Sequence, residues 1–387
     1  MDTPGLSFIE AGSAMKDFQP FVWCAVALSL LITSPTLADS TPTDNVGKSV
    51  QHALQYLETK AQQPDGSFAS YAGPGVTSVV TLAALRSGRS PDDPMVAKSL
   101  KYLEGFVQPD GGIYAKGTLY RNYETCLAMS VFAAANRKDR YKKILANADR
   151  FVKGIQWDEG EKHGEDSYNY GGAGYGKHKR PDLSNTSFLI EALRAAGNGP
   201  DDEAVQKALV FVSRCQNLET KYNTTVFSAR NPDGGFYYTC AAGGQSPAGK
   251  TPDGGLRSYG SMTYAGLKSM VYAGVKSKDS RVRAALTWIR KHYTLDSNPG
   301  MGNSGLYYYY QTFAKALDAT GFDQIEDSKG TKHNWRKELT DKLLKLQKPD
   351  GSWVNSDPRW LESNPSLVTG YALLALSYCR PSEPKKK

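Results

Sequence analysis

Six segments of this chain repeat apolar residues at steps of three and four. The apolar positions are Val46, Val50, Leu54 and Leu57; Val96, Leu100 and Leu103; Ile144, Ala148, Phe151 and Ile155; Val205, Leu209 and Val212; Val282, Leu286, Ile289 and Tyr293; and Trp335, Leu339, Leu343 and Leu346. Residues at this spacing share one face of a helix, and Lys, Arg and Glu fill the opposite face. The pattern therefore predicts six amphipathic helices, which begin near residues 46, 93, 139, 201, 280 and 334.

Six further segments, one after each of these helices, are apolar on nearly every side and rich in Ala, Ser and Thr. They are residues 77–85, 123–135, 185–196, 262–272, 306–319 and 367–378. Helices without a polar face are buried all round. Because the sequence shows no polar end repeats, which an open superhelix needs, the alternation predicts a closed all-α ring. We expect an (α/α)6 toroid of six helical hairpins, with the buried helices toward the axis and the amphipathic helices toward water.

One turn recurs along the chain at residues 64–68, 109–113, 232–236, 252–256 and 349–353. It reads Pro-Asp-Gly, then a small residue, then an apolar or aromatic residue. Pro sets φ for the first turn position, Asp bonds its own backbone, and Gly accepts a positive φ. Three of the turns closely follow Gln63, Gln108 or Gln347. The recurrence indicates internal duplication.

The turn, with its preceding Gln and following aromatic residue, resembles the prenyltransferase and squalene-oxidase repeat of squalene-hopene cyclases and protein prenyltransferase β subunits. The resemblance covers residues 46–380. It implies the terpenoid-cyclase-like toroid, a small hydrophobic or isoprenoid-like ligand in an aromatic-lined axial cavity, and a structural role for the Gln and the aromatic residue of each turn.

This chain lacks the residues that perform the chemistry of these families. Squalene-hopene cyclases carry Asp-x-Asp-Asp-Thr at the start of an inner helix, whereas this chain reads Asp182-Leu-Ser184-Asn185-Thr. A serine hydroxyl cannot replace the strongly acidic carboxyl that protonates the isoprenoid. Asp182 also suits the N-cap of a helix. Asp182 and Glu124 remain the weak candidates for a catalytic role.

The zinc site of protein prenyltransferases is also missing. Tyr123-Glu124-Thr-Cys126 places a glutamate where the resemblance implies a ligand histidine, and no Asp-x-Cys occurs. The five histidines show no ligand spacing. We therefore expect neither a metal nor another cofactor.

Two loops longer than the repeat, residues 158–181 and 219–260, are rich in Gly and Tyr, and such loops commonly carry function. Tyrosine offers an apolar face and a hydroxyl, although any one tyrosine can serve packing alone. The candidate ligand-binding residues are Tyr168, Tyr170, Tyr175, Lys177, Arg180, Asn185, Tyr237, Tyr259, Tyr264 and Tyr307.

Two other functions stay open. Toroids of this kind also host polysaccharide lyases and hydrolases, whose chemistry needs two carboxylates roughly 5 to 10 Å apart or a basic residue opposite an acidic sugar. Glu124, Asp166, Asp182 and Arg257 are the available residues. A non-catalytic scaffold whose loops bind a protein partner is the third hypothesis.

The termini predict export. An apolar run over residues 21–32 follows Lys16 and precedes the small residue Ala38, which is typical of a cleaved secretory signal over residues 1–38. A single N-terminal membrane anchor is the alternative. Residues 39–45 form a polar linker and residues 381–387 a basic disordered tail, and no stable membrane span is expected in the mature chain.

Charge and cysteine content add little to this picture. The formal net charge is +8, but the basic residues are scattered among acids, which argues against a nucleic-acid partner. The mature chain holds Cys126, Cys215, Cys240 and Cys379, and the sequence does not choose among their three possible disulfide pairings. Cys126 and Cys379 fall in apolar helices, which favours free buried thiols.

Overall fold

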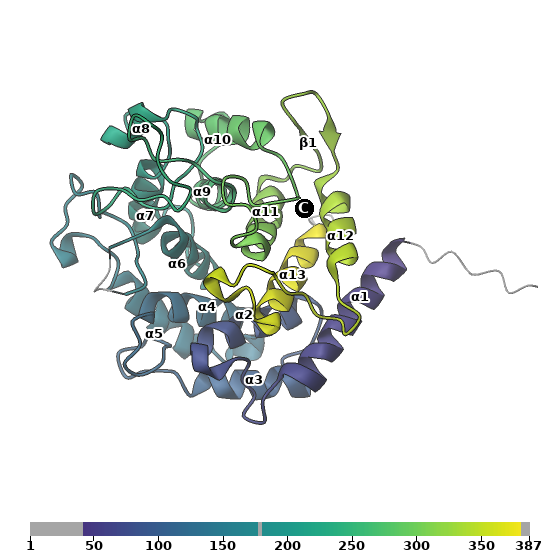
Figure 1. Cartoon of the computed structure of the whole chain (residues 1–387). Coiled ribbons are helices and arrows are strands. Elements are labelled where there is room, and N and C mark those ends of the chain that lie inside the picture. The colour runs from purple at the N-terminus through teal and green to yellow at the C-terminus, as the bar shows by residue number, and fades with distance from the viewer. Residues whose placement is uncertain (1–41, 177–179, 381–387) are drawn as a thin grey trace, which may run out of the picture. The chain divides into compact units, whose positions relative to one another are not determined.

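Six inner helices form a closed ring in the computed structural model, which describes residues 42–176 and 180–380 (Figure 1). They are α2 (Pro74–Arg86), α4 (Arg121–Ala134), α6 (Leu183–Ala195), α9 (Gly260–Tyr272), α11 (Leu306–Thr320) and α13 (Pro365–Cys379). Each packs on the next in this order, and α13 returns to α2. The six helices match the six segments predicted to be buried on every side.

Six outer helices surround this ring. They are α1 (Pro42–Tyr56, extended by a π-helical turn at Leu57–Ala61), α3 (Pro94–Glu104), α5 (Lys142–Lys153), α7 (Glu203–Arg214), α10 (Ser280–Lys291) and α12 (Trp335–Leu346). Each lies against an inner helix, and α12 also contacts α1. The all-α toroid predicted from the sequence is confirmed.

The predicted linker over residues 39–45 is wrong in its second half. Helix α1 already begins at Pro42, because proline is well accepted in the first turn of a helix. The rest of that linker, the predicted signal peptide (1–38) and the predicted basic tail (381–387) lie outside the described residues.

The remaining described elements are short. Helix α8 (Val226–Arg230) lies in the second long loop, and strands β1 (Ile325–Glu326) and β2 (Lys332–His333) pair antiparallel, with Ile325 opposite His333. Single 3-10 turns occupy Ser70–Ala72, Arg137–Asp139, Glu159–Glu161 and Arg359–Leu361. In residues 42–176 and 180–380, no helix has the length and apolar character that crossing a bilayer requires.

Glutamine side chains tie neighbouring outer helices together at four glycine-containing turns. In each case the side-chain amide donates both to a glycine carbonyl of the turn and to a backbone carbonyl in the next outer helix. The glutamines are Gln62, Gln156, Gln216 and Gln347. The prediction named Gln63 where Gln62 makes the link, and it missed Gln156 and Gln216. Gln108 differs, because its amide donates to carbonyls of its own turn, Phe106 and Tyr114.

The link at Gln347 joins the last repeat to the first. Its amide donates to Ser49 O at 3.0 Å, and its side-chain oxygen accepts from the Ser49 hydroxyl at 2.7 Å. The following turn brings Trp353 into the core, where its indole nitrogen donates to Leu343 O at 2.8 Å. These contacts close the seam between α12, α13 and α1.

Candidate functional site

Four aromatic side chains span the ring axis near the ends at which the inner helices begin. The ring centroids of Tyr123 and Phe188 are 5.4 Å apart, those of Phe188 and Tyr308 6.2 Å, and those of Tyr308 and Tyr371 6.0 Å. Tyr371 and Tyr123 share a hydrogen bond between their hydroxyls. These residues come from α4, α6, α11 and α13, and α6 and α11 are not neighbours in the ring, so the side chains must cross the axis. We name them the axial aromatic layer.

This layer is partly accessible to solvent. Tyr123, Phe188 and Tyr308 are half-buried, although they belong to inner helices, and only Tyr371 is classed as buried. Ser184, at the position that corresponds to the proton donor of cyclases, is also half-buried, and its hydroxyl lies 3.1 Å from the Tyr308 hydroxyl. The position of the missing acid therefore adjoins the layer, but it carries only an alcohol.

Asp182 caps helix α6, as predicted, and is completely buried. Its carboxylate accepts from the backbone N–H of Asn185 at 2.9 Å, from the Asn185 amide at 2.8 Å, and from the Tyr238 hydroxyl. Burial raises the pKa of Asp182 to about 6, because these hydrogen bonds only partly offset the loss of hydration.

Four of the predicted ligand-binding residues gather around Asp182, together with Tyr238. Tyr175 hydrogen-bonds to Tyr238, and the Arg180 guanidinium lies 5.5 Å from the Tyr238 ring centroid. Burial and the nearby Asp182 carboxylate raise the pKa of Tyr259. We name this set, completed by Asn185, the Asp182 cluster.

Asn185 carries an unmet acceptor in this cluster. Its side chain is buried, and its Oδ1 atom has no hydrogen-bond partner within the described part of the chain. A buried polar atom of this kind is costly unless water or a ligand satisfies it. The Asp182 cluster can therefore receive a hydroxyl group or another hydrogen-bond donor.

We expect the Asp182 carboxyl to titrate near pH 6. Its pKa is raised in the folded protein, so the stability that its neutral form confers is present below about pH 3.8 and lost as the pH rises through about 6. Carboxyl 13C NMR of the full chain labelled at Asp, assigned by loss of the signal in Asp182→Asn, measures this directly.

Asp65 is a control in the same spectrum. The Ser67 hydroxyl and backbone N–H bind its carboxylate and lower its pKa, so its midpoint should lie below the ordinary range. A midpoint near 4 for Asp182 would contradict the burial argument.

The other predicted ligand-binding tyrosines serve packing or lie apart from the cluster. The Tyr237 hydroxyl donates to Arg214 O at 2.6 Å, and Tyr264 packs on Tyr309 and Phe313. Tyr307 is buried against Tyr310, and Tyr168 is exposed. Tyr237, Tyr264 and Tyr307 are therefore not part of the Asp182 cluster, and their role in ligand binding stays a prediction. Lys177 lies outside the described residues.

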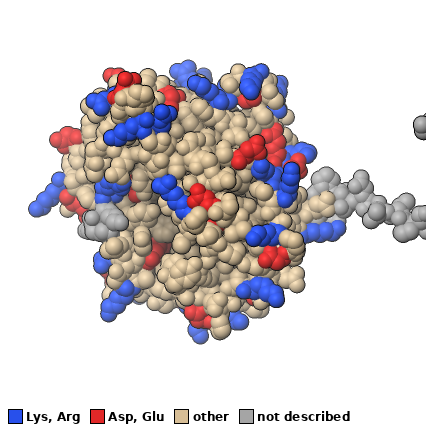
Figure 2. Space-filling view, in the orientation of Figure 1, with Lys and Arg blue, Asp and Glu red and all other residues tan. Residues whose placement is uncertain are grey.

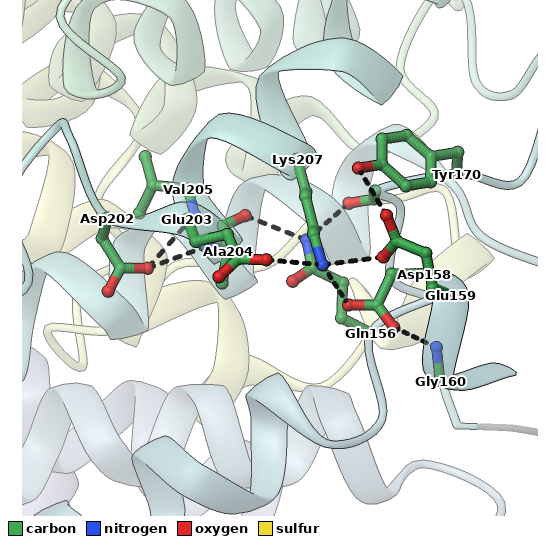
Figure 3. Close-up of polar contacts among 11 residues, drawn as sticks. Gln156, Asp158, Glu159, Gly160, Tyr170, Asp202, Glu203, Ala204, Val205 and Lys207 are labelled. Atoms are coloured by element: carbon green, nitrogen blue, oxygen red, sulfur yellow. Dashed lines mark hydrogen bonds and ion pairs between the residues drawn. The ribbon is translucent and has the colours of Figure 1, made fainter. Parts of the chain in front are cut away.

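Tyr170 belongs to an ion cluster that anchors the first long loop to α7 (Figure 3). Its hydroxyl donates to Glu159 at 3.2 Å. Lys207 Nζ lies 2.9 Å from Asp158, 2.8 Å from Glu159 and 2.9 Å from Glu203. The cluster accounts for the buried position of Tyr170 without a ligand, and a role of Tyr170 in ligand binding stays a prediction.

Glu124, the second weak catalytic candidate, holds the loop that precedes α4. Its two oxygens accept from Ala115 N at 2.8 Å and from the Thr118 hydroxyl at 3.1 Å, and burial raises its pKa. Asp166 and Arg257 are exposed.

A buried ionic layer crosses the axis farther along the inner helices. One oxygen of Glu191 in α6 pairs with Lys268 in α9, and the other pairs with Lys315 in α11. Lys315 Nζ also lies 5.9 Å from the Tyr378 ring centroid in α13. Burial alone would raise the pKa of Glu191, but the two ammonium groups lower it to about 2. No pattern in the sequence predicted this layer.

The surface around the axis carries no large field of one sign. Lys and Arg lie among Asp and Glu on the face shown in Figure 2. Within the described ranges, no three His, Cys, Asp or Glu side chains are grouped so that they could hold a metal ion.

Comparison with known proteins supports the architecture. The sequence profile of the squalene-hopene cyclase C-terminal domain matches residues 71–241. A solved polysaccharide lyase is similar over 86% of this chain and 96% of its own, at 10% identity and a TM-score of 0.51. The type II terpene cyclase MstE from Scytonema, in complex with geranylgeranyl dihydroxybenzoate, is matched over 87% of this chain and 97% of its own, at 12% identity and a TM-score of 0.33. No curated protein sequence matches.

Proposed function

We propose that this squalene-hopene cyclase-like repeat toroid binds a hydrophobic, isoprenoid-like ligand on its axial aromatic layer. The observation that carries the proposal is that three of the four rings remain accessible although they cross the axis. Aromatic rings present large apolar faces, and their removal from water by a ligand is favourable.

Exposed apolar side chains at the same end of the ring support this proposal. Tyr71, Leu119, Tyr120 and Trp360 are all exposed and precede the inner helices α2, α4 and α13. This exposed surface continues toward the axis at Tyr120, whose ring centroid lies 5.1 Å from that of Tyr175. Apolar patches of this kind on a soluble protein commonly mark a binding surface.

The turn at Trp360 and Leu361 is strained. Both residues have positive φ values, 56° and 63°, which bulky side chains rarely adopt. The next residue holds the turn in place, because the Glu362 carboxylate accepts from Tyr307 N at 3.1 Å and Tyr308 N at 2.8 Å. Strain of this kind collects at ligand sites, and here it is tied to the helix that carries Tyr308.

The Asp182 cluster supplies the polar end of the proposed site. Asn185 Oδ1 can accept from a ligand hydroxyl, and the Arg180 guanidinium over the Tyr238 ring supplies a positive charge for an anionic group. Protonation of an alkene is not part of the proposal, because Ser184 replaces the acid and the Asp182 carboxylate is enclosed by Asn185 and Tyr238.

A polysaccharide lyase or hydrolase is the second candidate, suggested by the similar fold of the solved lyase. The phenols argue against it, since burial raises the pKa of Tyr238 and Tyr308 and keeps them protonated. A phenol in that state is a poor general base. Release of unsaturated or reducing sugar ends from a polysaccharide panel would establish this function instead.

Replacement of Phe188 by alanine should weaken binding of geranylgeraniol by about tenfold. The expected loss follows from removing part of one aromatic contact face, worth about 1 to 2 kcal/mol. Titration calorimetry with the full chain measures the change.

Phe106→Ala is the matched control, because Phe106 is also half-buried but packs on Tyr102 in the outer layer. Equal affinity of the Phe188 variant and the wild type would contradict the proposed surface. The absence of any isoprenoid binding would leave the carbohydrate-active and scaffold hypotheses.

A further inference from the structure

Two buried cysteines meet where the second long loop passes the end of α7. Cys215 is the C-cap residue of α7, and Cys240 follows the strand-like segment of the loop. Neither side chain is exposed to solvent, and the two thiols lie close enough to interact electrostatically. The Cys240 thiol also donates to Tyr168 O at 3.4 Å.

Backbone hydrogen bonds hold the segments that carry Cys215 and Cys240 close together. Gln216 and Phe236 form an antiparallel bridge, and Tyr237 N donates to Cys215 O at 3.1 Å. The Tyr237 hydroxyl donates to Arg214 O at 2.6 Å, which holds the same two segments together a second time. The approach of the thiols is therefore built into the fold.

The other two cysteines lie elsewhere. Cys126 is buried in α4, where its thiol lies 3.5 Å from Asn122 Oδ1. Cys379 ends α13 and lines a groove with residues of α1 and α12. The structure therefore favours a single disulfide, Cys215–Cys240, with Cys126 and Cys379 as free thiols.

We propose that Cys215 and Cys240 form a disulfide that fastens the loop over residues 219–260 to α7. Each thiol loses one proton, and the pair gives two electrons to a disulfide oxidant such as oxidised glutathione, which becomes two thiols. The bond forms during folding, before the thiols are enclosed, because burial then raises the pKa of Cys215 and suppresses its thiolate.

The disulfide would also stabilise one wall of the Asp182 cluster. Tyr238 O accepts from Leu183 N at 2.8 Å, and the Thr239 hydroxyl donates to Pro181 O at 2.8 Å. Tyr238 and Thr239 lie directly before Cys240 in the chain. The inference concerns the covalent structure only, so it does not depend on the proposed ligand.

Peptide mapping of the full chain tests the proposal. The reduced, denatured protein is refolded in a glutathione and oxidised-glutathione buffer, alkylated with iodoacetamide and digested with trypsin. We expect residues 215–221 to be recovered linked to residues 231–250, with a mass two hydrogens below the sum of the free peptides. The oxidised protein should melt about 5 °C above the reduced protein, because the bond closes a long loop.

Cys240→Ser should abolish both the linked peptide and the rise in Tm, whereas Cys379→Ser should retain both. Recovery of Cys215 and Cys240 as alkylated free thiols after oxidative refolding would overturn the proposal. So would a linkage of either residue to Cys126 or Cys379. Because the linked peptide is read in the wild type, a poorly folding variant does not remove the test.

Discussion

Replacement of Glu191 by glutamine is expected to lower the free energy of unfolding by about 3 to 5 kcal/mol at pH 7. Glu191 is the counter-charge of both Lys268 and Lys315, and all three side chains are buried. The variant keeps the shape of the side chain but leaves two ammonium groups without an anion in a medium that solvates charge poorly. Urea denaturation of both proteins, followed by circular dichroism, measures the difference.

Glu203→Gln is the control for this prediction. Glu203 also pairs with a lysine, Lys207, but its side chain is 83% exposed, and exposed pairs contribute only about 0 to 1 kcal/mol. Similar losses in the two variants would contradict the importance of the buried layer.

Acidification should remove the effect of the Glu191 variant. The pKa of Glu191 is lowered from its ordinary value near 4.5 to about 2, so its ionised form adds stability above pH 4.5 that is lost as the pH falls toward 2. The difference between wild type and Glu191→Gln should therefore narrow across this range.

Replacement of Gly351 by alanine is expected to cost about 3 kcal/mol of stability. Gly351 has a φ of 89°, and a Cβ atom added there would lie 2.5 Å from the backbone oxygen of His52 in α1. The variant therefore combines an unfavourable backbone conformation with a clash at the seam of the ring. Guanidinium denaturation of the full chain measures the loss.

Gly197→Ala separates the two contributions. Gly197 has a similar φ of 99°, but an added Cβ would meet no atom within 4 Å. We expect only the conformational cost of about 1 kcal/mol. If Gly351→Ala lost no more stability than Gly197→Ala, the backbone at the seam would be able to move away from the added Cβ atom.

The helical architecture could be predicted from the sequence because burial follows the apolar pattern directly. The twelve amphipathic and all-apolar segments correspond to α1–α7 and α9–α13 with shifts of a few residues, and only the short α8 was not predicted. The glutamine links were harder to assign, since Gln62 and Gln63 are adjacent and only the path of the backbone decides which amide reaches Met95 O. Gln156 precedes no Pro-Asp-Gly turn, so the motif gave no signal for it.

The candidate site was only partly predictable for a similar reason. Tyr175, Arg180 and Tyr259 lie around Asp182 and Asn185 contacts it directly, whereas the neighbouring residues Tyr170 and Tyr237 turn into the packing between layers. The Gly and Tyr content indicated the loops that border the Asp182 cluster, but it could not indicate the direction of each side chain. The ionic layer was invisible in the sequence, because Glu191, Lys268 and Lys315 lie on three separate helices that meet only when the ring closes.

The hydrogen bond between Gln347 and Ser49 connects residues 298 positions apart, which affects the cooperativity of unfolding. A linear array of repeats can fray from its ends, because each unit touches only its neighbours. Here the array has no free end within the described part of the chain, and the rings of the axial aromatic layer come from four different repeats. Loss of any hairpin removes two interfaces at once, so we expect the protein to unfold in a single transition rather than repeat by repeat.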